Sequence, residues 1–229
     1  MIEITALIPA YNEAAIIGRT VTALARVPEV KEIVVVDDGS QDQTAREAVL
    51  AGARVLRLGQ NRGKAEAVLA GSRLARFPYL ALLDADLGES ASEIARLIAS
   101  LPAGKKAMAV ALFPPSRQKG GLGLVKKMAA WAVYCSTGIA MREPLSGQRV
   151  LHRDLLGLLC SRPRGFGLEM ALNLDLPRRG VAVIEVETEM RHRERGKDAA
   201  SILHRARQGR AVLQELWIRR SLFMRGCRA

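Results

Sequence analysis

Two carboxylates, Asp84 and Asp86, follow a short apolar run at residues 79–83 and are separated only by Ala85. If that run is a buried strand, both side chains can face the crevice beyond its carboxyl end. Packed together without partners, they would repel and shift each other's pKa values. A hard divalent cation such as Mg²⁺ or Mn²⁺ would remove this conflict, because it binds carboxylate and diphosphate oxygens. The alternative interpretation is a strand-end turn with two solvated acids.

Three further polar motifs follow apolar runs in the same way. They are Pro9-Ala10-Tyr11-Asn12-Glu13, Asp37-Asp38-Gly39-Ser40 and Asn61-Arg62-Gly63-Lys64. An acid after a strand can accept hydrogen bonds from a ribose hydroxyl or a base N–H. In the third motif, Gly63 would let a ligand approach the backbone closely, and Lys64 supplies one positive charge. The alternatives are helix capping, for which Ser40 and Gln43 form a capping-box pattern, and a surface lysine at a helix start.

The segments around these motifs alternate between strand and helix patterns. Strand patterns occupy residues 2–9, 32–37, 54–58, 79–83 and 107–113, and helical patterns occupy 13–27, 64–76, 90–101 and a segment starting at Ser40. Continuous apolar strands between helices predict an α/β fold with a mostly parallel, Rossmann-like sheet covered by helices on both faces. Such sheets bind ligands beyond the carboxyl ends of their strands, where all four motifs lie. No Walker or GxGxxG pattern is present.

The second half of the chain is less regular. We expect a Gly-rich basic loop leading into a helix at residues 114–127, a helix at 165–179, a strand at 181–186 and a basic amphipathic helix at 199–224. Because no linker or repeat is visible, we predict one domain over residues 1–229. Within it, we distinguish residues 1–113, residues 114–198 and a basic C-terminal helix at residues 199–229.

The composition excludes some classes of protein. Hydrophobic residues make up 49% of the 229 residues and charged residues 25%, which excludes disorder as the main state. Three distant cysteines exclude a disulfide scaffold and favour a reducing compartment. The chain opens without a signal pattern and has no apolar run near the roughly 20 residues that span a bilayer. We therefore expect a cytoplasmic protein, peripheral at the inner face of the membrane.

The formal net charge is +12, and eight of these charges lie in residues 191–229, which hold eleven Lys and Arg against three Asp and Glu. In the final helix, Ile202, Ala206, Leu213, Leu216 and Trp217 can form one apolar face, with Arg205, Arg207, Arg210, Arg219 and Arg220 on the rest. This pattern fits a helix on an anionic membrane surface. Packing on the protein's own domain is the alternative. An RNA-binding tail is disfavoured, because aromatic residues make up only 4%.

Taken together, the order and spacing of the four motifs resemble family 2 glycosyltransferases with the GT-A fold, over roughly the first half of the chain. The resemblance implies a nucleotide-sugar donor and a divalent cation, Mg²⁺ or Mn²⁺, on its diphosphate. It implies that residues 1–113 are the nucleotide-sugar-binding half and residues 114–198 the acceptor-side half. It implies that Asp86 binds the metal. The implied donor contacts are Pro9, Ala10, Tyr11, Glu13, Asp38, Gly63, Lys64, Asp84, Ala85 and Asp86.

Three motifs of the second half resemble glucosyl-3-phosphoglycerate synthases and some polyprenyl-phosphate glycosyltransferases. They are Pro144-Leu145-Ser146-Gly147, Gly165-Phe166-Gly167-Leu168-Glu169 and His192-Arg193. The resemblance implies that His192 is a second metal ligand and that Glu169 lies beside the acceptor. The flanking arginines would disfavour the imidazolium form and leave a neutral ring free to ligate. A solvated histidine in a basic stretch is the alternative.

Glu169 stands in an apolar helical context, where an unpaired acid would be costly to bury. It should face the crevice or pair with an arginine such as Arg149. With Asp86 it is the predicted catalytic residue, either as a base for an acceptor hydroxyl or, for a phosphate acceptor, as a positioning group. The predicted acceptor contacts are Arg117, Lys119, Gly147, Arg149 and Arg193. The glycines of the basic loop suggest a lid that closes over the donor.

These features predict a metal-dependent glycosyltransferase that moves a sugar from a UDP- or GDP-sugar to a phosphorylated acceptor. Polyprenyl phosphate is favoured because it fits the basic amphipathic tail. Transfer to a small soluble acid such as 3-phosphoglycerate is the alternative. A non-catalytic nucleotide- or nucleic-acid-binding module is the alternative from another class. The sequence leaves the sugar, the base, the stereochemical outcome and a homo-oligomer open.

Overall fold

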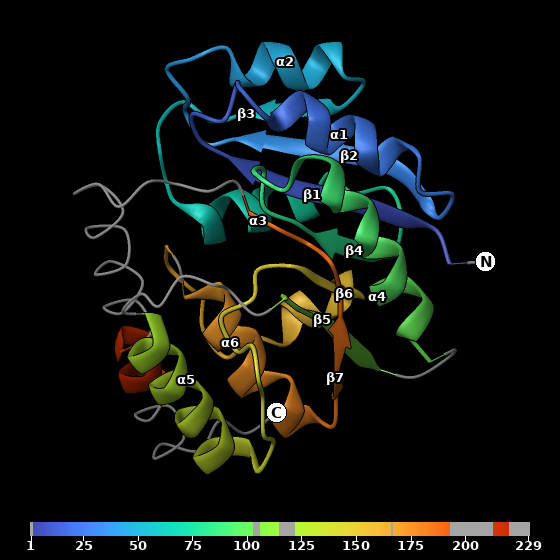
Figure 1. Cartoon of the computed structure of the whole chain (residues 1–229). Helices are drawn as coiled ribbons and strands as arrows, with labels where there is room; N and C mark the ends of the chain where they lie inside the picture. Colours follow the sequence, from blue (N-terminus) through green and yellow to red (C-terminus); the bar gives the residue numbers. More distant parts are fainter. Residues whose placement is uncertain (1, 103–105, 115–121, 166, 193–212, 220–229) are drawn as a thin grey trace.

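The computed structural model describes residues 2–102, 106–114, 122–165, 167–192 and 213–219 (Figure 1). The strands are β1 (Ile4–Ala10), β2 (Val30–Asp37), β3 (Arg54–Arg57), β4 (Tyr79–Leu82), β5 (Ala107–Leu112), β6 (Arg149–His152) and β7 (Ala182–Glu187). The α-helices are α1 (Ile17–Ala25), α2 (Thr44–Leu50), α3 (Lys64–Ser72), α4 (Ile94–Ser100), α5 (Leu122–Thr137) and α6 (Leu168–Asp175). Three short 3₁₀ helices are η1 (Gly88–Glu93), η2 (Arg153–Leu158) and η3 (Pro177–Arg179).

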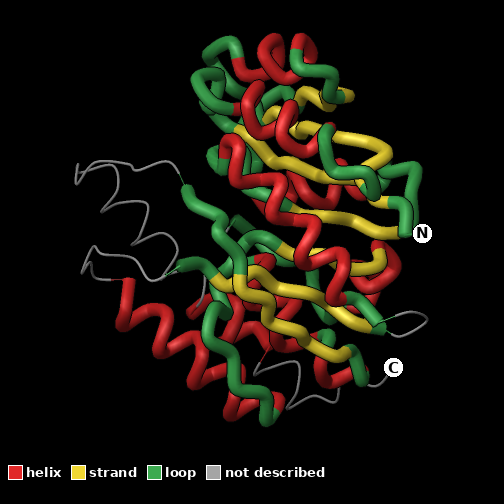
Figure 2. Tube along the Cα trace, turned by 45° about the vertical axis from the view of Figure 1, so that its right-hand side comes forward, coloured by secondary structure: helices red, strands yellow, loops and turns green. Residues whose placement is uncertain are grey.

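The strands form one seven-stranded sheet in the order β3-β2-β1-β4-β6-β5-β7. All neighbouring pairs are parallel except those of β6, which runs antiparallel to β4 and β5. Helices α1, α2 and α4 pack on one face, and α3, α5 and α6 on the other (Figures 1 and 2). The predicted α/β architecture, with a mostly parallel sheet covered on both faces, is therefore confirmed.

The alternation of side chains along the central strand explains why this layering forms. In β1, Ile4, Ala6 and Ile8 join the apolar core under α1 and α4, whereas Leu7 joins the core under α3. All of them are fully buried. A strand that is apolar on both sides can only be stable between two helical layers, because either face alone would leave large apolar side chains in water.

The first half of the sheet matches the sequence-based elements, but several helix boundaries were wrong. The helix predicted for residues 13–27 is α1 at Ile17–Ala25, and the segment 90–101 is a 3₁₀ turn, η1, that continues into α4. The helix predicted for 165–179 is split in the same way between α6 and η3. Apolar spacing alone does not distinguish a 3₁₀ turn from the first or last turn of an α-helix.

The capping box predicted at Ser40 does not form. Helix α2 begins at Thr44, and its N-cap residue Gln43 makes no side-chain cap hydrogen bond. The Ser40 hydroxyl instead accepts a hydrogen bond from the backbone N–H of Asn12 at 2.9 Å. A contact to the neighbouring strand-end loop therefore replaces the local contact that the sequence pattern suggested.

The sequence analysis missed strand β6. It is four residues long and lies antiparallel between β4 and β5, with Leu82 opposite Arg149 and Val110 also opposite Arg149. Because β6 enters the sheet beside β4, the residues that precede it come to lie next to Asp84. This strand connects the second half of the chain to the strand-end motifs of the first half.

The C-terminal helix is described only at residues 213–219, and the other residues of the predicted helix lie outside the described part of the chain. Its predicted solvated arginine, Arg219, is 1% exposed and forms ion pairs with Asp175 and Glu215. The assignment of Arg219 to a solvated polar face was therefore wrong. Among the described residues, no helix combines the length and apolarity needed to cross a membrane.

Two helical glycines give a matched test of this packing. A Cβ on Gly71 of α3 would lie 2.6 Å from Cγ2 of Val36 and would also clash with Leu7, whereas one on Gly18 of α1 would meet only the carbonyl of Glu47 at 3.8 Å. We expect Gly71→Ala to lower the free energy of unfolding by about 1–3 kcal/mol through overpacking.

Gly18→Ala is the control, and we expect it to leave the stability unchanged or raise it by up to about 1 kcal/mol through helix propensity. Urea denaturation of both variants measures the difference. Equal effects of the two substitutions would contradict the close packing of α3 on β1 and β2.

Candidate active site

The loops that follow β1 and β2 hold each other in place. The Thr44 hydroxyl accepts a hydrogen bond from the N–H of Glu13 at 2.8 Å, and the Asp42 carboxylate accepts one from the N–H of Ala14 at 3.1 Å. Asn12 has a positive φ of 55°, which turns the chain sharply after the strand. Tyr11 is 43% exposed beside this turn. The two motifs therefore form one rigid rim beside the sheet.

Asp38 connects this rim to the loop before α3. It is 4% exposed, and its carboxylate accepts hydrogen bonds from the N–H groups of Arg62 and Gly63 at 2.8 and 2.7 Å. Its own N–H donates to the carbonyl of Ala10 at 2.8 Å. Both carboxylate oxygens thus have backbone partners in this conformation. The nucleotide contacts predicted for Ala10, Tyr11, Glu13 and Asp38 stay predictions.

Lys64, the first residue of α3, lies between two carboxylates. Its Nζ is 2.6 Å from Oδ1 of Asp84 and 2.8 Å from Oε1 of Glu169. Burial alone would lower the pKa of Lys64, but the charges and hydrogen bonds of these two acids outweigh it and raise the pKa above its ordinary value. The ammonium therefore stays charged and holds the end of β4 against α6.

Asp84 is fully engaged by this network. Besides Lys64, the side-chain amide of Gln148 donates to its Oδ2 at 2.7 Å. Burial would raise the pKa of Asp84, but the charges of Lys64 and His192 and the hydrogen bonds from Lys64 and Gln148 hold it well below its usual range. Both oxygens of this carboxylate thus already have strong donors. Asp84 is therefore better placed to fix the geometry of the site than to ligate a metal directly.

Of the two alternatives considered for Glu169, the structure shows the side chain lining the crevice and not the pair with Arg149. Glu169 pairs with Lys64 instead. Arg149 is fully buried and donates to the carbonyls of Pro144 and Ser146 at 3.1 and 2.9 Å and to Oδ1 of Asn173 at 2.6 Å. Burial lowers its pKa to about 10. Its contact with an acceptor stays a prediction, and in this structure it holds the turn before β6.

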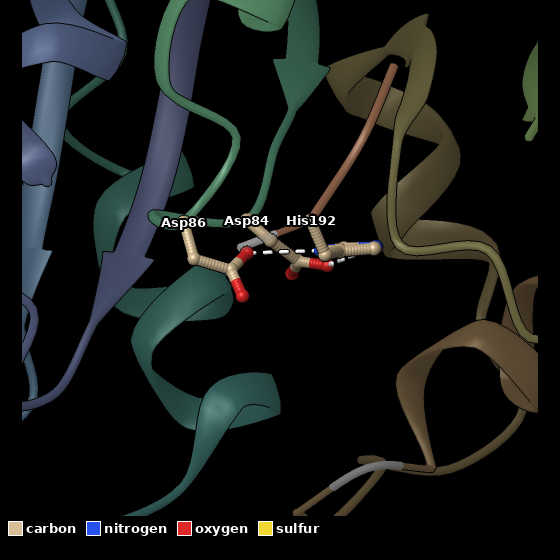
Figure 3. Close-up of side chains that lie close together, drawn as sticks. All are labelled: Asp84, Asp86 and His192. Atoms are coloured by element: carbon tan, nitrogen blue, oxygen red, sulfur yellow. Dashed lines mark hydrogen bonds and ion pairs between the residues drawn. The ribbon is translucent and has the colours of Figure 1, made fainter. Parts of the chain in front are cut away.

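Asp86 and His192, the two predicted metal ligands, lie side by side although 106 positions separate them (Figure 3). His192 Nδ1 is 2.9 Å from Oδ1 of Asp86, and Nε2 is 4.0 Å from Oδ2 of Asp84. The imidazole stacks on Phe113, with ring centroids 4.8 Å apart. The backbone N–H of the preceding residue donates to the Ser90 hydroxyl at 3.1 Å. Stacking and backbone tethering thus fix the ring against the carboxylates.

The protonation expected for His192 was wrong for this structure. Burial lowers its pKa, but the hydrogen bond to Asp86 and the charges of Asp84 and Asp86 outweigh that effect, so the pKa is raised above its ordinary value. The sequence argument weighed only the arginines that flank His192 along the chain. Two carboxylates that are distant in the sequence, those of Asp84 and Asp86, dominate the electrostatic field at the imidazole ring of His192.

The donor set fits a divalent cation. Ligand atoms of Asp84, Asp86 and His192 all lie within 4.8 Å of one another. Carboxylate oxygens suit Mg²⁺ and Mn²⁺, and an imidazole nitrogen is a further acceptable ligand, especially for Mn²⁺. Lys64 and Gln148 already occupy the carboxylate of Asp84, whereas Asp86 and His192 contact each other at 2.9 Å. Their role as direct metal ligands stays a prediction.

Gly147 completes the site from the second half of the chain. A Cβ at this position would lie 2.9 and 3.1 Å from the two carboxylate oxygens of Asp84 and would clash with the ammonium of Lys64. Pro9, Lys64, Gly147 and Glu169 line a crevice without room for a water molecule. The backbone before β6 therefore packs directly over the Lys64–Asp84 pair, which only a glycine permits.

Other predicted residues fall in different places. Gly63 lies at the loop before α3 with a φ of 88°, and a Cβ there would come within 3.2 Å of the Cα of Gly165. Ala85 is buried, and its carbonyl accepts a hydrogen bond from the Thr20 hydroxyl at 2.8 Å. The predicted acceptor contacts Arg117, Lys119 and Arg193, and the glycine-rich part of the proposed lid, lie outside the described residues.

Sequence reasoning missed two contributors to the site. Gln148 contacts Asp84, and Phe113 stacks on His192. Gln148 directly follows the Pro144–Gly147 motif, so its position next to a noticed glycine was the available signal. Phe113 ends an apolar run and gave none, because an aromatic residue at a strand end is ordinary core composition.

Comparison with known proteins decides the family. Residues 5–153 match the family model described as Glycosyl transferase family 2. The chain belongs to glycosyl transferase family 2. This segment includes all four strand-end motifs and Gly147, and it ends just after β6. The predicted family and the predicted enzyme class, a glycosyltransferase, are confirmed.

Several known proteins resemble the chain over most of its length. "Glycosyltransferase AglJ" of Haloferax volcanii is 26% identical over 93% of this chain and 70% of its own length. "Undecaprenyl-phosphate 4-deoxy-4-formamido-L-arabinose transferase" of Pseudomonas paraeruginosa is 29% identical over 84% of this chain. The alignment covers only 58% of that relative, and a match to the succinoglycan biosynthesis protein ExoU of Rhizobium meliloti covers 26% of it.

Solved structures of glucosyl-3-phosphoglycerate synthase from Mycobacterium tuberculosis share the fold. One, in complex with Mg²⁺ and uridine diphosphate, is 25% identical, with a TM-score of 0.75 over 93% of this chain and 79% of that one. Another, with Mn²⁺, UDP-glucose and glycerol 3-phosphate, matches with the same identity, TM-score and coverage. This glycosyltransferase therefore has the predicted GT-A-type architecture.

The close approach at Gly147 generates a prediction. We expect Gly147→Ala to displace the Lys64 ammonium from Asp84 and to lower transferase turnover by about 100-fold, since misplacing reactive groups by about 1 Å can cost that much. The matched control is Gly157→Ala, where a Cβ would meet no atom within 4 Å. Steady-state rates of both variants, with their folding checked by circular dichroism, provide the measurement. Wild-type rates for Gly147→Ala would refute the tight packing over the site.

Proposed function

We propose that this enzyme transfers a sugar from a UDP- or GDP-sugar to the phosphate of a polyprenyl phosphate, with Mg²⁺ or Mn²⁺ bound by Asp86 and His192. The observation that carries the proposal is the Asp86–His192 pair at the carboxyl end of β4 (Figure 3). It lies beside the Lys64–Asp84 pair, so both groups face the same strand end. In family 2 glycosyltransferases, this is where the sequence motifs imply a nucleotide-sugar donor.

The charge of the cluster supports a divalent cation. The ammonium of Lys64 contacts the carboxylates of Asp84 and Glu169, and a third carboxylate, that of Asp86, contacts His192. With a neutral imidazole, the cluster carries two excess negative charges, which match the charge of Mg²⁺ or Mn²⁺. A cation bound here would neutralise the diphosphate that departs from the sugar, which is where negative charge grows in the transition state.

Other residues of the chain hold Asp84 and His192 in place. Lys64 and Gln148 hold Asp84, so the carboxyl end of β4 keeps one geometry. Phe113 supports the ring of His192 from behind. Preorganisation of this kind lowers the cost of rearranging charges during the reaction. Tyr11 and Glu13 on the neighbouring rim are then positioned to contact the nucleoside.

A phosphate acceptor agrees with the contacts of Glu169. The residue is 6% exposed, and its carboxylate lies 2.8 Å from Nζ of Lys64. An anionic phosphate oxygen can attack the sugar without losing a proton, so no general base is needed. We therefore assign Glu169 a positioning role through Lys64. The 29% identity to an undecaprenyl-phosphate transferase over 84% of the chain supports the lipid acceptor.

Transfer to a small soluble acid is the second candidate. It is favoured by the match to the mycobacterial synthase, solved with UDP-glucose and glycerol 3-phosphate, at a TM-score of 0.75. In that case the attacking group is a hydroxyl, and Glu169 would act as its base. The two candidates share the donor site and differ at the acceptor. Turnover with polyprenyl phosphate in detergent and with 3-phosphoglycerate, at a fixed donor, distinguishes them.

The metal assignment is tested by donor binding. We expect calorimetry with UDP-glucose, GDP-mannose and UDP-GlcNAc to show one donor whose binding requires Mn²⁺. Asp86→Asn should abolish the metal-dependent part, and His192→Ala should weaken it by at least about tenfold, the loss typical of a disturbed metal site.

The matched control is Asp154→Asn, because the side chain of Asp154 is 78% exposed and lies outside the site. It should bind like the wild type. Metal-dependent donor binding that is unchanged in His192→Ala would disprove the ligand role of this histidine.

The role of Glu169 is tested by Glu169→Gln. With a phosphate acceptor we expect kcat to fall about tenfold or less, and metal-dependent donor binding to persist, because only the positioning of Lys64 is weakened. Loss of a general base would instead cost about 10²–10⁴-fold in kcat with a hydroxyl acceptor. The pH profile of kcat adds a second readout, since loss of a base removes its acidic limb.

A further inference from the structure

The outward face of α5 is unusually apolar. The 16 residues of this helix contain two lysines and no acidic residue. Leu124, Trp131 and Tyr134 are 78%, 68% and 57% exposed. With Lys127, they follow at intervals of three, four and three residues, which places them along one side of the helix. Exposed apolar side chains that gather on one face mark an interaction site rather than ordinary surface.

The opposite side of α5 packs against the hydrophobic core. Ala129 and Val133 are fully buried in the core beneath α5. A helix that is apolar all round is normally buried all round. In the described structure, α5 is covered on one side only. Its exposed stripe is therefore in excess of what folding of the domain requires.

The described part of the C-terminal helix also exposes large apolar side chains. Leu213 and Trp217, one turn apart, are 55% and 74% exposed, whereas Arg219 is buried in its ion pairs. Residues 213–219 lie at the same side of the molecule as α5 (Figure 1). Both tryptophans of the chain are thus exposed, in a protein with only 4% aromatic residues. The buried Arg219 fixes the orientation in which Trp217 faces outward.

We propose that the outward face of α5, together with Leu213 and Trp217, docks onto an anionic lipid bilayer. Tryptophan and tyrosine favour the membrane–water interface, where the ring is apolar and its N–H or O–H stays hydrated. The only charged residue in the α5 stripe is Lys127, and the chain carries a net charge of +12. Such a surface combines apolar insertion with attraction to anionic headgroups.

A second copy of the chain is a poorer occupant. A two-fold contact through α5 would bring the same patch of both copies together, so Lys127 would face a like charge with no acid on either helix. Anionic headgroups instead neutralise that charge. The proposal rests on the proposed function, because a polyprenyl phosphate presents its headgroup at the same bilayer surface.

The docking face is connected to the active site through short contacts. Lys126 on α5 forms an ion pair with Glu143, next to the turn that brings Gly147 over Lys64. Only residues 114–121 separate Phe113, which stacks on His192, from the start of α5. A bilayer on α5 thus lies beside the acceptor side of the sheet.

Vesicle flotation of the full chain tests the proposal. The vesicles are made of phosphatidylcholine alone or of phosphatidylcholine with phosphatidylglycerol. We expect wild-type protein to float only with the anionic vesicles, and high salt to weaken it. Leu124→Glu and Trp131→Glu should each reduce the partition coefficient by at least about tenfold, because each places a charge among groups that insert.

The matched control is Leu50→Glu. Leu50 is 69% exposed on α2, at the other end of the molecule from α5 (Figure 1). This variant has the same change of charge and should float like the wild type. Because all three positions are exposed, the variants should fold, and circular dichroism and donor-binding calorimetry check this. Equal loss of flotation in Leu50→Glu, or none in either α5 variant, would overturn the proposal.

Two further outcomes are decisive. A wild-type dimer that Leu124→Glu converts to a monomer, without vesicle binding by either, would assign the face to a second copy and overturn the proposal. Transfer to polyprenyl phosphate in detergent without vesicle binding would overturn the docking surface but not the function. Anionic-vesicle binding that the α5 variants lose, without transfer to polyprenyl phosphate, would support the surface and refute the acceptor.

Discussion

The partly buried ion pairs of Lys64 are the interaction on which the site depends. The lysine joins three elements, because α3 supplies the lysine, the end of β4 supplies Asp84 and α6 supplies Glu169. If the lysine were removed, both carboxylates would lose their shared cation. Such a loss commonly costs about 3–5 kcal/mol in a fully buried pair and costs less here, because Asp84 is partly exposed to water. The glycine at position 147 follows from the same constraint, since any larger residue would displace the ammonium. The Lys64 ammonium therefore restricts which residue types are possible at positions in both halves of the chain.

The insertion of β6 explains how two acids that are two residues apart acquire different roles. The segment before β6 brings Gln148 to Asp84, so that carboxylate has donors on both oxygens. The carboxylate of Asp86 has no contact with Lys64 or Gln148 among the described residues, and its described hydrogen bond is to Nδ1 of His192. The first acid therefore shapes the strand end and the second is available to a metal. The Asp-x-Asp spacing places both acids in the crevice, but the antiparallel strand decides between them.

The sheet could be predicted from the sequence because its causes are local. Continuous apolar runs between helical patterns require two covering layers, and the polar motifs at the strand ends could be placed at one edge on that basis alone. Partners that come from distant segments could not be predicted in this way. The choice of Lys64 over Arg149 for Glu169 depends on β6, which has only four residues and no distinctive pattern. The prediction of a neutral His192 was wrong for the same reason. The groups that raise its pKa, Asp84 and Asp86, lie more than 100 positions away in the chain.

Arg219 shows how burial can overrule a helical charge pattern. Periodicity places it among the arginines of a solvated face, yet it is 1% exposed and bound to Asp175 and Glu215. The pair with Asp175 fixes the rotation of the helix about its axis, because any other rotation would take Arg219 away from Asp175 and leave that buried carboxylate without its cation. Burial accordingly raises the pKa of Glu215 despite the nearby arginine. The rotation that satisfies Arg219 is also the one that turns Trp217 outward, so the exposure of that ring is a consequence of buried electrostatics rather than of a loosely attached tail.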